Sequence, residues 1–341
     1  MHRLPVTIMS YFANLVCDST QAWRKFFFTP ADPRPLGLIR IIVGSLVVWD
    51  LATLGPDLKD YLGSNGWIGP EALRQFLAQT SPGAWSFWLV VPDRWLMPVW
   101  VGCLIVATIF TLGLATRTSA ILVWVIALST ARRAPVTLFG FDQMNATWIL
   151  YLAVTGASGQ ALSLDRFLAT RRVRRQHAAG TNNNSLPRPT VSANIGLRLI
   201  QLHLAIVYGS SGLSKLMGVE WWNGTALEMI LLTPEFRRLD PAWFFAHRWL
   251  LQLATHAALA LEISYPVLIW VRPLRPLLLA AVFVMHVSIA LMLGLTEFSL
   301  VMMAANLAFV TRRPHVPQTK AASSPVLSPG RPRGKSSALR R

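Results

Sequence analysis

Four polar residues between Gln201 and Lys215 recur at helical spacing within a stretch that is otherwise apolar. Gln201, Tyr208, Ser211 and Lys215 fall on one face of the helix that this stretch predicts. An amine that is kept partly away from water favours its neutral form, and a neutral amine accepts protons. The pattern therefore favours Lys215 as a general base at the end of a polar stripe.

Small residues accompany this stripe. Ser211 and Gly212 follow Tyr208 closely, so a planar apolar substrate bounded by Tyr208 could approach the helix. Two plainer interpretations stay open. Small residues in an apolar helix often serve packing against a neighbouring helix, and a lysine near a helix end can extend toward lipid headgroups.

Further ionisable residues lie in apolar runs, where a charge costs at least about 2.5–3.5 kcal/mol at the centre of a membrane helix. His286 is at the midpoint of the run 276–296, and it could supply a hydrogen bond from a facing helix, as could Glu262. Glu262 could instead be a structural partner of Lys215 or Arg40. Arg40 and Asp50 could be simple interface anchors, and the other two histidines of the apolar runs, His203 and His256, could be satisfied in the core.

The composition indicates where these residues reside. Hydrophobic residues make up 53% of the 341 and charged residues only 14%, and there are 14 Trp and two Cys. These values exclude an ordinary soluble enzyme, a disordered chain and a disulfide scaffold, and they fit a multi-pass membrane protein. The net charge of +17 is concentrated in 163–195 and in the tail after Thr311. Such clusters usually mark the cytoplasmic side of a membrane, so no nucleic-acid partner is expected.

Eight apolar runs are candidate membrane spans, which predicts an all-α integral membrane protein in contact with the lipid bilayer. The runs are 36–54, 95–116, 118–131, 143–164, 198–217, 249–271, 276–296 and 298–311. Placing the N-terminus inside puts most Lys and Arg on the cytoplasmic side, as the positive-inside rule requires. We therefore expect a multi-pass protein of the cell membrane with both termini in the cytoplasm.

Three segments follow from this count. Residues 1–34 are expected to be an N-terminal interfacial segment with a helix over 6–28. Residues 35–311 are expected to form the polytopic membrane domain, with a cytoplasmic linker at 166–194. Residues 312–341 are expected to be a disordered basic tail.

The membrane histidines are isolated from one another, and no metal site is predicted.

Several short motifs have a known counterpart. Residues 208–216 read Tyr-Gly-Ser-Ser-Gly-Leu-Ser-Lys-Leu, and Trp221-Trp222-Asn223-Gly224 follows; Glu262, Met285-His286 and Glu297-Phe298-Ser299 come later in the same order. Together with 35–50, 112–117 and 163–166, these motifs resemble the HTTM (horizontally transferred transmembrane) domain family and the membrane part of the vitamin K-dependent gamma-carboxylases. The resemblance covers about residues 35–310.

The resemblance implies chemistry and roles. In the carboxylases a lysine deprotonates vitamin K hydroquinone, which then reacts with O2 and leads to addition of CO2 to a protein glutamate. Lys215 stands where that lysine stands, and His286 stands where the family places a membrane histidine. The carboxylases carry another histidine near 139–145, where this sequence has Asp142 as the nearest positional substitute.

Two functions follow as hypotheses. The first is a membrane enzyme in which Lys215 acts as base on a lipid-soluble quinol, with a protein substrate left open. The second is a non-catalytic membrane binding, transport or assembly factor of the same fold.

Overall fold

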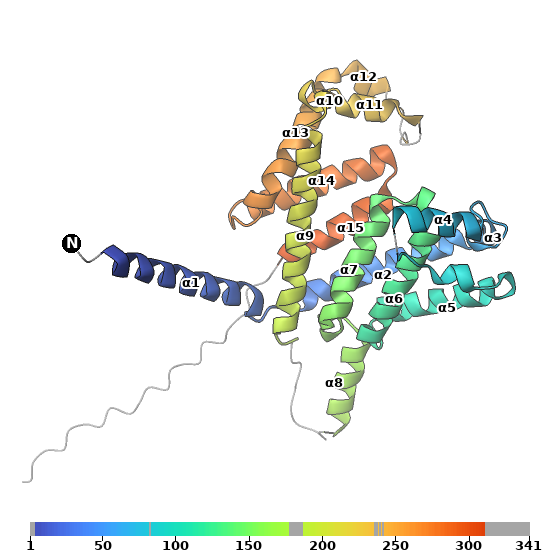
Figure 1. Cartoon of the computed structure of the whole chain (residues 1–341), viewed down its shortest axis with the longest axis horizontal. Coiled ribbons are helices and arrows are strands. Elements are labelled where there is room, and N and C mark those ends of the chain that lie inside the picture. The colour runs from blue at the N-terminus through green and yellow to red at the C-terminus, as the bar shows by residue number, and fades with distance from the viewer. Residues whose placement is uncertain are drawn as a thin grey trace, which may run out of the picture.

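The chain is built from α-helices and short 3-10 turns over the residues that the structure describes. The structure is a computed structural model, and it describes residues 4–81, 83–176, 187–234, 238, 240 and 242–310. This part contains fifteen α-helices (Figure 1), which confirms the all-α class. They are α1 (Leu4–Phe28), α2 (Arg34–Leu54), α3 (Leu58–Leu62), α4 (Pro70–Thr80), α5 (Asp93–Leu112), α6 (Thr116–Arg133), α7 (Gly140–Thr155), α8 (Leu164–Gln176), α9 (Val191–Lys215), α10 (Val219–Trp222), α11 (Ala226–Leu232), α12 (Ala242–Ala246), α13 (Arg248–Leu268), α14 (Arg275–Leu293) and α15 (Thr296–Asn306).

In the part of the chain that the structure describes, four helices are long and apolar enough to cross a bilayer, namely α2, α5, α9 and α14. Large apolar side chains on their outer faces are exposed, as at Ile105, Ile206 and Phe283. Lipid is the solvent that accepts such surfaces. The protein is therefore a helical membrane protein with several candidate spans. The other four runs of the sequence form α6, α7, α13 and α15, and the total of eight spans stays a prediction.

Helix α2 lies inside the bundle and packs against α5, α7 and α15, while α9 packs along α13. Leu36, Ile39 and Val43 of α2 are completely buried, as are Phe110 of α5 and Trp148 of α7. Spacings of three and four residues place the α2 side chains on one inward stripe. This packing fixes α9 and α13 as the two long walls of the region around Lys215.

Glycine in the left-handed region ends several of the long helices. Gly113, Gly156 and Gly294 have φ angles of 73°, 61° and 71° and follow α5, α7 and α14. Glycine adopts this conformation without the steric cost of a Cβ atom. The predicted run 143–164 is therefore corrected, because α7 stops at Thr155 and a 3-10 turn, η3 (Ala157–Gln160), follows.

A buried arginine closes the end of the bundle where α2 begins. Arg40 donates hydrogen bonds to the carbonyl oxygens of Ser158 (2.6 Å) and Leu162 (2.5 Å). Both acceptors belong to the chain that follows α7, so the guanidinium holds α2 to that segment. A buried charge needs such partners, and these two hydrogen bonds supply them for Arg40.

The same end carries a capping carboxylate. Asp165 accepts hydrogen bonds from the backbone nitrogens of Ala115 and Thr116, both at 2.8 Å, and from the Thr116 hydroxyl at 2.7 Å. Burial alone would raise the pKa of Asp165, but these hydrogen bonds and the charge of Arg40 hold it below its usual value. Asp165 thus caps α6 from a distant part of the chain.

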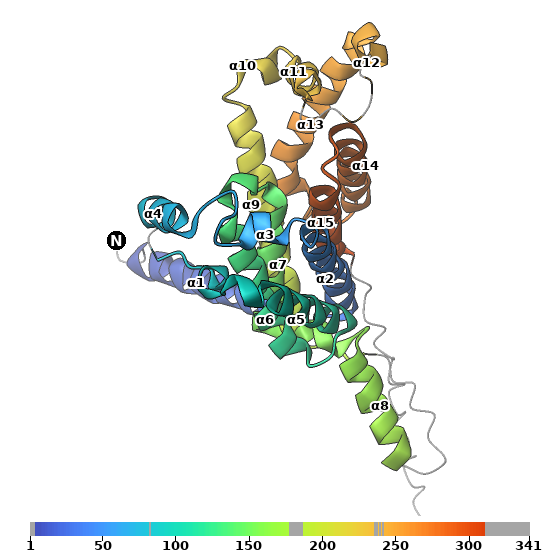
Figure 2. The same cartoon turned by 90° about the vertical axis from the view of Figure 1, so that its right-hand side faces the viewer.

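Two helices project from the bundle. Figures 1 and 2 show α1 and α8 extending away from it, α1 to the side and α8 downward. Helix α1 agrees with the predicted helix over 6–28. The expected linker 166–194 is corrected in part, because α8 continues to Gln176 and α9 already begins at Val191. The expected disordered tail 312–341 lies outside the described residues.

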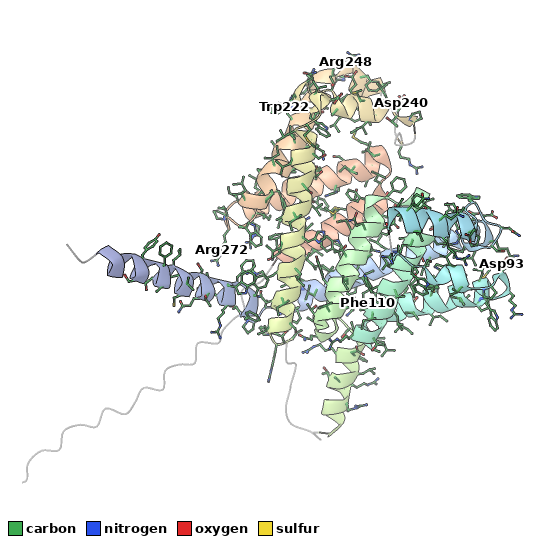
Figure 3. The ribbon with its side chains drawn as sticks, in the orientation of Figure 1. Asp93, Phe110, Trp222, Asp240, Arg248 and Arg272 are labelled. Atoms are coloured by element: carbon green, nitrogen blue, oxygen red, sulfur yellow. The ribbon has the colours of Figure 1, made fainter. Side chains whose placement is uncertain are left out.

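The opposite end of α9 carries a cap of short helices, α10 to α12. Figure 3 shows Trp222, Asp240 and Arg248 gathered there, at the top of the view. The indole of Trp222 donates to the carbonyl oxygen of Leu216 (2.8 Å), which fastens α10 over the end of α9. The candidate site begins directly beneath this cap.

Candidate functional site

Lys215 forms an ion pair between α9 and α13. Its Nζ lies 2.6 Å from Oε2 of Glu262 and 2.6 Å from Oγ of Ser211. The side chains of Lys215 and Glu262 are 21% and 10% exposed. Of the alternatives left open by the sequence, the structure selects Glu262 as the partner of Lys215. The amine therefore turns toward α13 rather than extending freely to headgroups.

Gly212 makes this approach possible. A Cβ atom added to Gly212 would lie 2.9 Å from Cγ1 of Ile263, 3.0 Å from the Ile263 nitrogen and 3.2 Å from the Glu262 carbonyl carbon. The backbone of α13 thus rests directly on α9 one turn before Lys215. Gly212 consequently serves helix packing, and through that packing it sets the distance between the amine and the carboxylate.

The two tryptophans of α10, Trp221 and Trp222, differ in position. Nζ of Lys215 lies 5.1 Å from the centroid of the Trp221 ring, within the range of a cation–π interaction. Trp222 instead is 61% exposed and bonds to the backbone of α9. Trp221 therefore belongs to the surroundings of the amine, whereas Trp222 supports the cap.

A chain of buried polar groups lies deeper along α9. The hydroxyl of Tyr265 donates to Oδ1 of Asn306 (2.7 Å), and Nδ2 of Asn306 approaches the Tyr208 hydroxyl at 3.4 Å. The Tyr208 oxygen in turn lies 2.8 Å from Nε2 of His286. These four side chains come from α9, α13, α14 and α15, so this polar chain ties four helices together.

One tautomer of His286 fits a Tyr208 hydroxyl that accepts a hydrogen bond from Asn306. If Tyr208 accepts from Asn306, its own O–H is free to donate to Nε2, and the proton of the neutral imidazole then resides on Nδ1. His286 is 2% exposed, and its Nδ1 has no hydrogen-bond partner among the described residues. The polar chain therefore ends in a buried ring nitrogen that has no partner among the described residues, which calls for an explanation.

Tyr265 and Asn306 are site residues that the sequence analysis missed. Both are buried, at 0% and 6% exposure. Asn306 could have been predicted as a site residue, because a polar amide inside the apolar run 298–311 requires a hydrogen-bond partner. Tyr265 gave no such signal, since tyrosine is common near the ends of apolar helices.

Comparison with known proteins identifies the family of this region. Residues 167–313 match the family model described as the HTTM domain. Residues 167–313 are an HTTM domain. No match was found among curated proteins or among solved structures.

The HTTM domain contains both polar clusters. Lys215 and Glu262 lie within the matched residues, and so do Tyr208, His286 and Asn306. Arg40 and Asp142 precede the match, and neither touches these groups. Arg40 lies at the opposite end of the bundle, and Asp142 caps α7, where its Oδ2 accepts a hydrogen bond from the Phe139 nitrogen at 2.9 Å.

The remaining histidines of the apolar runs stand apart. His203 pairs with the Tyr151 hydroxyl at 2.8 Å, and Nε2 of His256 lies 3.1 Å from the Trp222 carbonyl oxygen. Each has a local partner, but His256 is exposed and His203 is only partly buried, whereas the plainer interpretation expected both in the core. The HTTM domain thus contains two separate polar sites. One is the Lys215–Glu262 ion pair beneath the cap of α10 to α12, and the other is the buried ring of His286.

Proposed function

We propose that this protein is a membrane enzyme whose HTTM domain removes a proton from a lipid-soluble quinol at the Lys215–Glu262 pair. The observation that carries the proposal is the 2.6 Å contact between Nζ of Lys215 and Oε2 of Glu262, inside a membrane domain and next to small residues. The proposal does not use Arg40 or Asp142, which lie away from this pair.

The pair gains one positive charge when it accepts a proton, and the oxyanion left on the substrate balances that charge. When an acidic hydroxyl gives its proton to the Glu262 carboxylate, the ammonium of Lys215 loses its counter-ion and is free to face the new oxyanion. Alternatively, Lys215 first gives a proton to Glu262, and the neutral amine then takes the proton of the substrate. In both cases the final state is a protonated Glu262, an ammonium at Lys215 and an oxyanion on the substrate. The lysine therefore stabilises the anion by either route.

The His286 donor supports binding of the same class of substrate. A quinol or quinone has two oxygens on an apolar ring, and Nδ1 of His286 is a buried donor without a partner. Tyr208, Tyr265 and Phe298 supply aromatic surfaces beside it. A quinol such as vitamin K hydroquinone would supply the electrons for a reaction with O2, and CO2 would be used if the resemblance to the carboxylases extends to the second step.

The membrane topology belongs to the proposal. We place the N-terminus and the basic tail in the cytoplasm and the cap of α10–α12 on the other side. One end of the bundle contains the start of α2, the ends of α5 and α7, the start of α9 and the whole of α8 (Figure 1). Helix α8 contains Arg166, Arg171 and Arg172, as expected for a cytoplasmic segment.

The test is quinol oxidation by the purified protein in lipid nanodiscs under air. Wild type is compared with Lys215→Met and with the double variant Lys215→Met/Glu262→Leu, in which an apolar pair replaces the ion pair and preserves packing. Both variants are expected to lose turnover while the double variant remains folded. Equal turnover in wild type and the folded double variant contradicts the proposal.

One observation favours the non-catalytic alternative. Ser211 and Glu262 together occupy the amine of Lys215, and the pair joins α9 to α13 as a purely structural contact would. In that case the protein would be a membrane binding, transport or assembly factor. It would then bind a quinone at His286 without oxidising the quinol. Measuring quinone binding and quinol turnover on the same samples distinguishes this function from the enzyme.

A further inference from the structure

Three arginines, Arg198, Arg272 and Arg275, form a cluster near the start of α9, and we call them the arginine cluster. Arg198 lies in the second turn of α9, Arg272 in the turn between α13 and α14, and Arg275 is the first residue of α14. The charge of Arg275 is close enough to act on Arg198, and the charge of Arg272 acts on Arg275. Figure 3 labels Arg272, which lies at the edge of the bundle near the end of α13.

Three neighbouring aromatic rings support two of these guanidiniums. Cζ of Arg198 lies 4.0 Å from the centroid of the Phe26 ring and 6.0 Å from that of the Trp270 ring. Cζ of Arg275 lies 5.7 Å from the centroid of the Phe309 ring. The Trp270 centroid is 5.7 Å from that of Phe26 and 5.5 Å from that of Phe309. Cation–π contacts with one aromatic group therefore hold both guanidiniums without neutralising them.

Hydrogen bonds use only some of the donors of these two arginines. Arg198 donates from Nε to the Phe26 carbonyl oxygen at 3.1 Å and from Nη1 to Oε1 of Gln201 at 2.9 Å. Arg275 donates from Nε to the Ile269 carbonyl oxygen at 3.2 Å. Nη2 of Arg198 and both Nη atoms of Arg275 have no hydrogen-bond partner among the described residues. They are donors that the described part of the protein does not use.

No carboxylate balances the arginine cluster within the described residues. The ion pairs of Asp and Glu found there all involve other cations. Residues 312–341, which come later in the sequence, contain no Asp or Glu. Positive charges that lie close together repel one another unless an anion lies among them. The arginine cluster therefore favours an anion from outside the chain.

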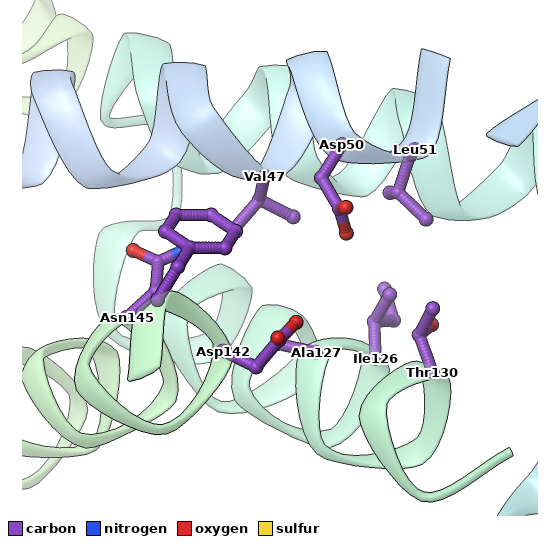
Figure 4. A pocket seen from close by; sticks show the side chains of 9 residues that line it. Val47, Asp50, Leu51, Ile126, Ala127, Thr130, Asp142 and Asn145 are labelled. Atoms are coloured by element: carbon purple, nitrogen blue, oxygen red, sulfur yellow. The ribbon is translucent and has the colours of Figure 1, made fainter. Parts of the chain in front are cut away.

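The other end of α2 offers an anion no comparable place. Figure 4 shows Asp50 of α2 and Asp142 of α7 on either side of a small cavity, which has room for one water-sized occupant. An anion there would meet two carboxylates. Helices α2 and α9 begin at the same end of the bundle, where the backbones of Ala31 and Thr190 are paired. An anionic ligand is therefore expected at this shared end, where the arginine cluster lies.

Apolar surface adjoins the arginine cluster. Val271, next to Arg272, is 40% exposed, and Leu277, two positions after Arg275, is 70% exposed. Helix α14 is one of the candidate membrane spans, and acyl chains are the solvent for such surfaces. A ligand that combines a phosphate group with acyl chains would contact both the guanidiniums and this apolar surface, which a soluble phosphate would leave uncovered.

We propose that the arginine cluster binds the phosphate group of an anionic phospholipid. The fork of a guanidinium matches two phosphate oxygens, and arginine recognises phosphate in this way. The acyl chains would lie along the exposed side of α14. The topology proposed above places this end of the bundle at the cytoplasmic leaflet, where basic pockets between membrane helices bind anionic headgroups. The site is separate from Lys215 and Glu262 and does not depend on quinol oxidation.

The test measures lipid binding to the delipidated full-length protein in detergent. Wild type is titrated with palmitoyl-oleoyl phosphatidylglycerol (POPG) or with the matching phosphatidylcholine (POPC). Native mass spectrometry counts the bound lipid, and tryptophan fluorescence follows Tm. We expect POPG to bind about tenfold more tightly than POPC and to raise Tm, because the choline headgroup adds a positive charge. The preference for POPG should weaken as the salt concentration rises.

Arg272→Gln is the main variant, because Arg272 is exposed and forms no hydrogen bond or ion pair among the described residues. It should weaken POPG binding about fivefold, and Arg272→Gln/Arg275→Gln should weaken it further. Arg94→Gln is the matched control, because Arg94 is also exposed but lies in the first turn of α5, at the other end of the bundle. It should bind POPG as wild type does.

Three results overturn the site. If wild type binds POPG and POPC equally, the protein does not select an anionic headgroup. If Arg272→Gln and Arg94→Gln weaken POPG binding equally, the lipid is held by surface charge in general. If inorganic phosphate raises the Tm of wild type and POPG does not, the ligand is a soluble anion rather than a lipid. The comparisons on wild type decide the matter even when the double variant fails to fold.

Discussion

Gly212 of α9 lies so close to Ile263 of α13 that an added Cβ atom would be 3.0 Å from the Ile263 backbone nitrogen. Backbone cannot move aside as the end of a flexible side chain can. This contact is what brings Glu262 within reach of Lys215.

Gly212→Ala is therefore expected to push α9 and α13 apart and to destabilise the protein by about 1–3 kcal/mol, as overpacking does. Gly102→Ala in α5 is the control, because a Cβ atom there meets nothing within 4 Å. That variant should be neutral or stabilised by about 0.5–1 kcal/mol, since alanine favours the helix. Thermal unfolding followed by tryptophan fluorescence compares the two. Equal effects of both substitutions would show that the helices are not in close contact.

The Lys215–Glu262 pair should behave as a coupled unit. Lys215→Met leaves the carboxylate of Glu262 without its partner, and Glu262→Leu leaves the amine without its partner, so each is expected to cost about 3–5 kcal/mol. The double variant should cost clearly less than the sum of the two, because no uncompensated charge remains. Additive effects in unfolding experiments would mean that the two side chains do not interact.

Tyr208→Phe tests the buried polar chain. The substitution leaves His286 without a hydrogen bond on either ring nitrogen, and we expect a loss of about 1–3 kcal/mol. Tyr151→Phe is a matched control, because Tyr151 also bonds a histidine at 2.8 Å but in a place that is only half-buried. Its cost should be smaller, at about 0.5–1.5 kcal/mol. A larger loss for Tyr151→Phe in thermal unfolding would argue against the burial of the Tyr208–His286 contact.

Asp165 predicts a pH dependence at the opposite end of the bundle. Its pKa is lower in the folded protein, so the carboxylate contributes its full stability above its unfolded pKa of about 3.9 and loses it as the pH falls through the lower folded value. Asp165→Ala should therefore be less stable than wild type by about 0.5–2 kcal/mol at pH 7, as loss of a helix cap is. The difference should shrink as the pH is lowered below about 4. A constant difference across this range in Tm measurements would contradict the capping role.

The helices were predictable because lipid imposes long apolar runs, and every one of the eight runs coincides with a helix. Their ends were less predictable. The run 143–164 is continuous in hydropathy, but Gly156 adopts a left-handed conformation and stops α7. Hydropathy does not report backbone conformation, so the η3 turn and its contact with Arg40 could not be foreseen.

The site was predictable in part for a similar reason. Ionisable residues in apolar runs are few, so Lys215, Glu262 and His286 were found by type alone. Their grouping depends on which helices are neighbours, and one sequence does not contain that information. Arg40 was included as an ionisable residue of an apolar run and Asp142 on resemblance, yet both lie at other places in the fold. Asn306 was overlooked although its amide completes the polar chain.

The partners of Arg40 also bear on how the protein is made. Ser158 and Leu162 follow Arg40 by 118 and 122 positions, so the ribosome completes α2 long before either acceptor emerges. Until then the guanidinium of a nascent α2 has no backbone carbonyls to replace water. The contacts that hold the start of α2 in the bundle can therefore form only after η3 and Leu162 have been synthesised.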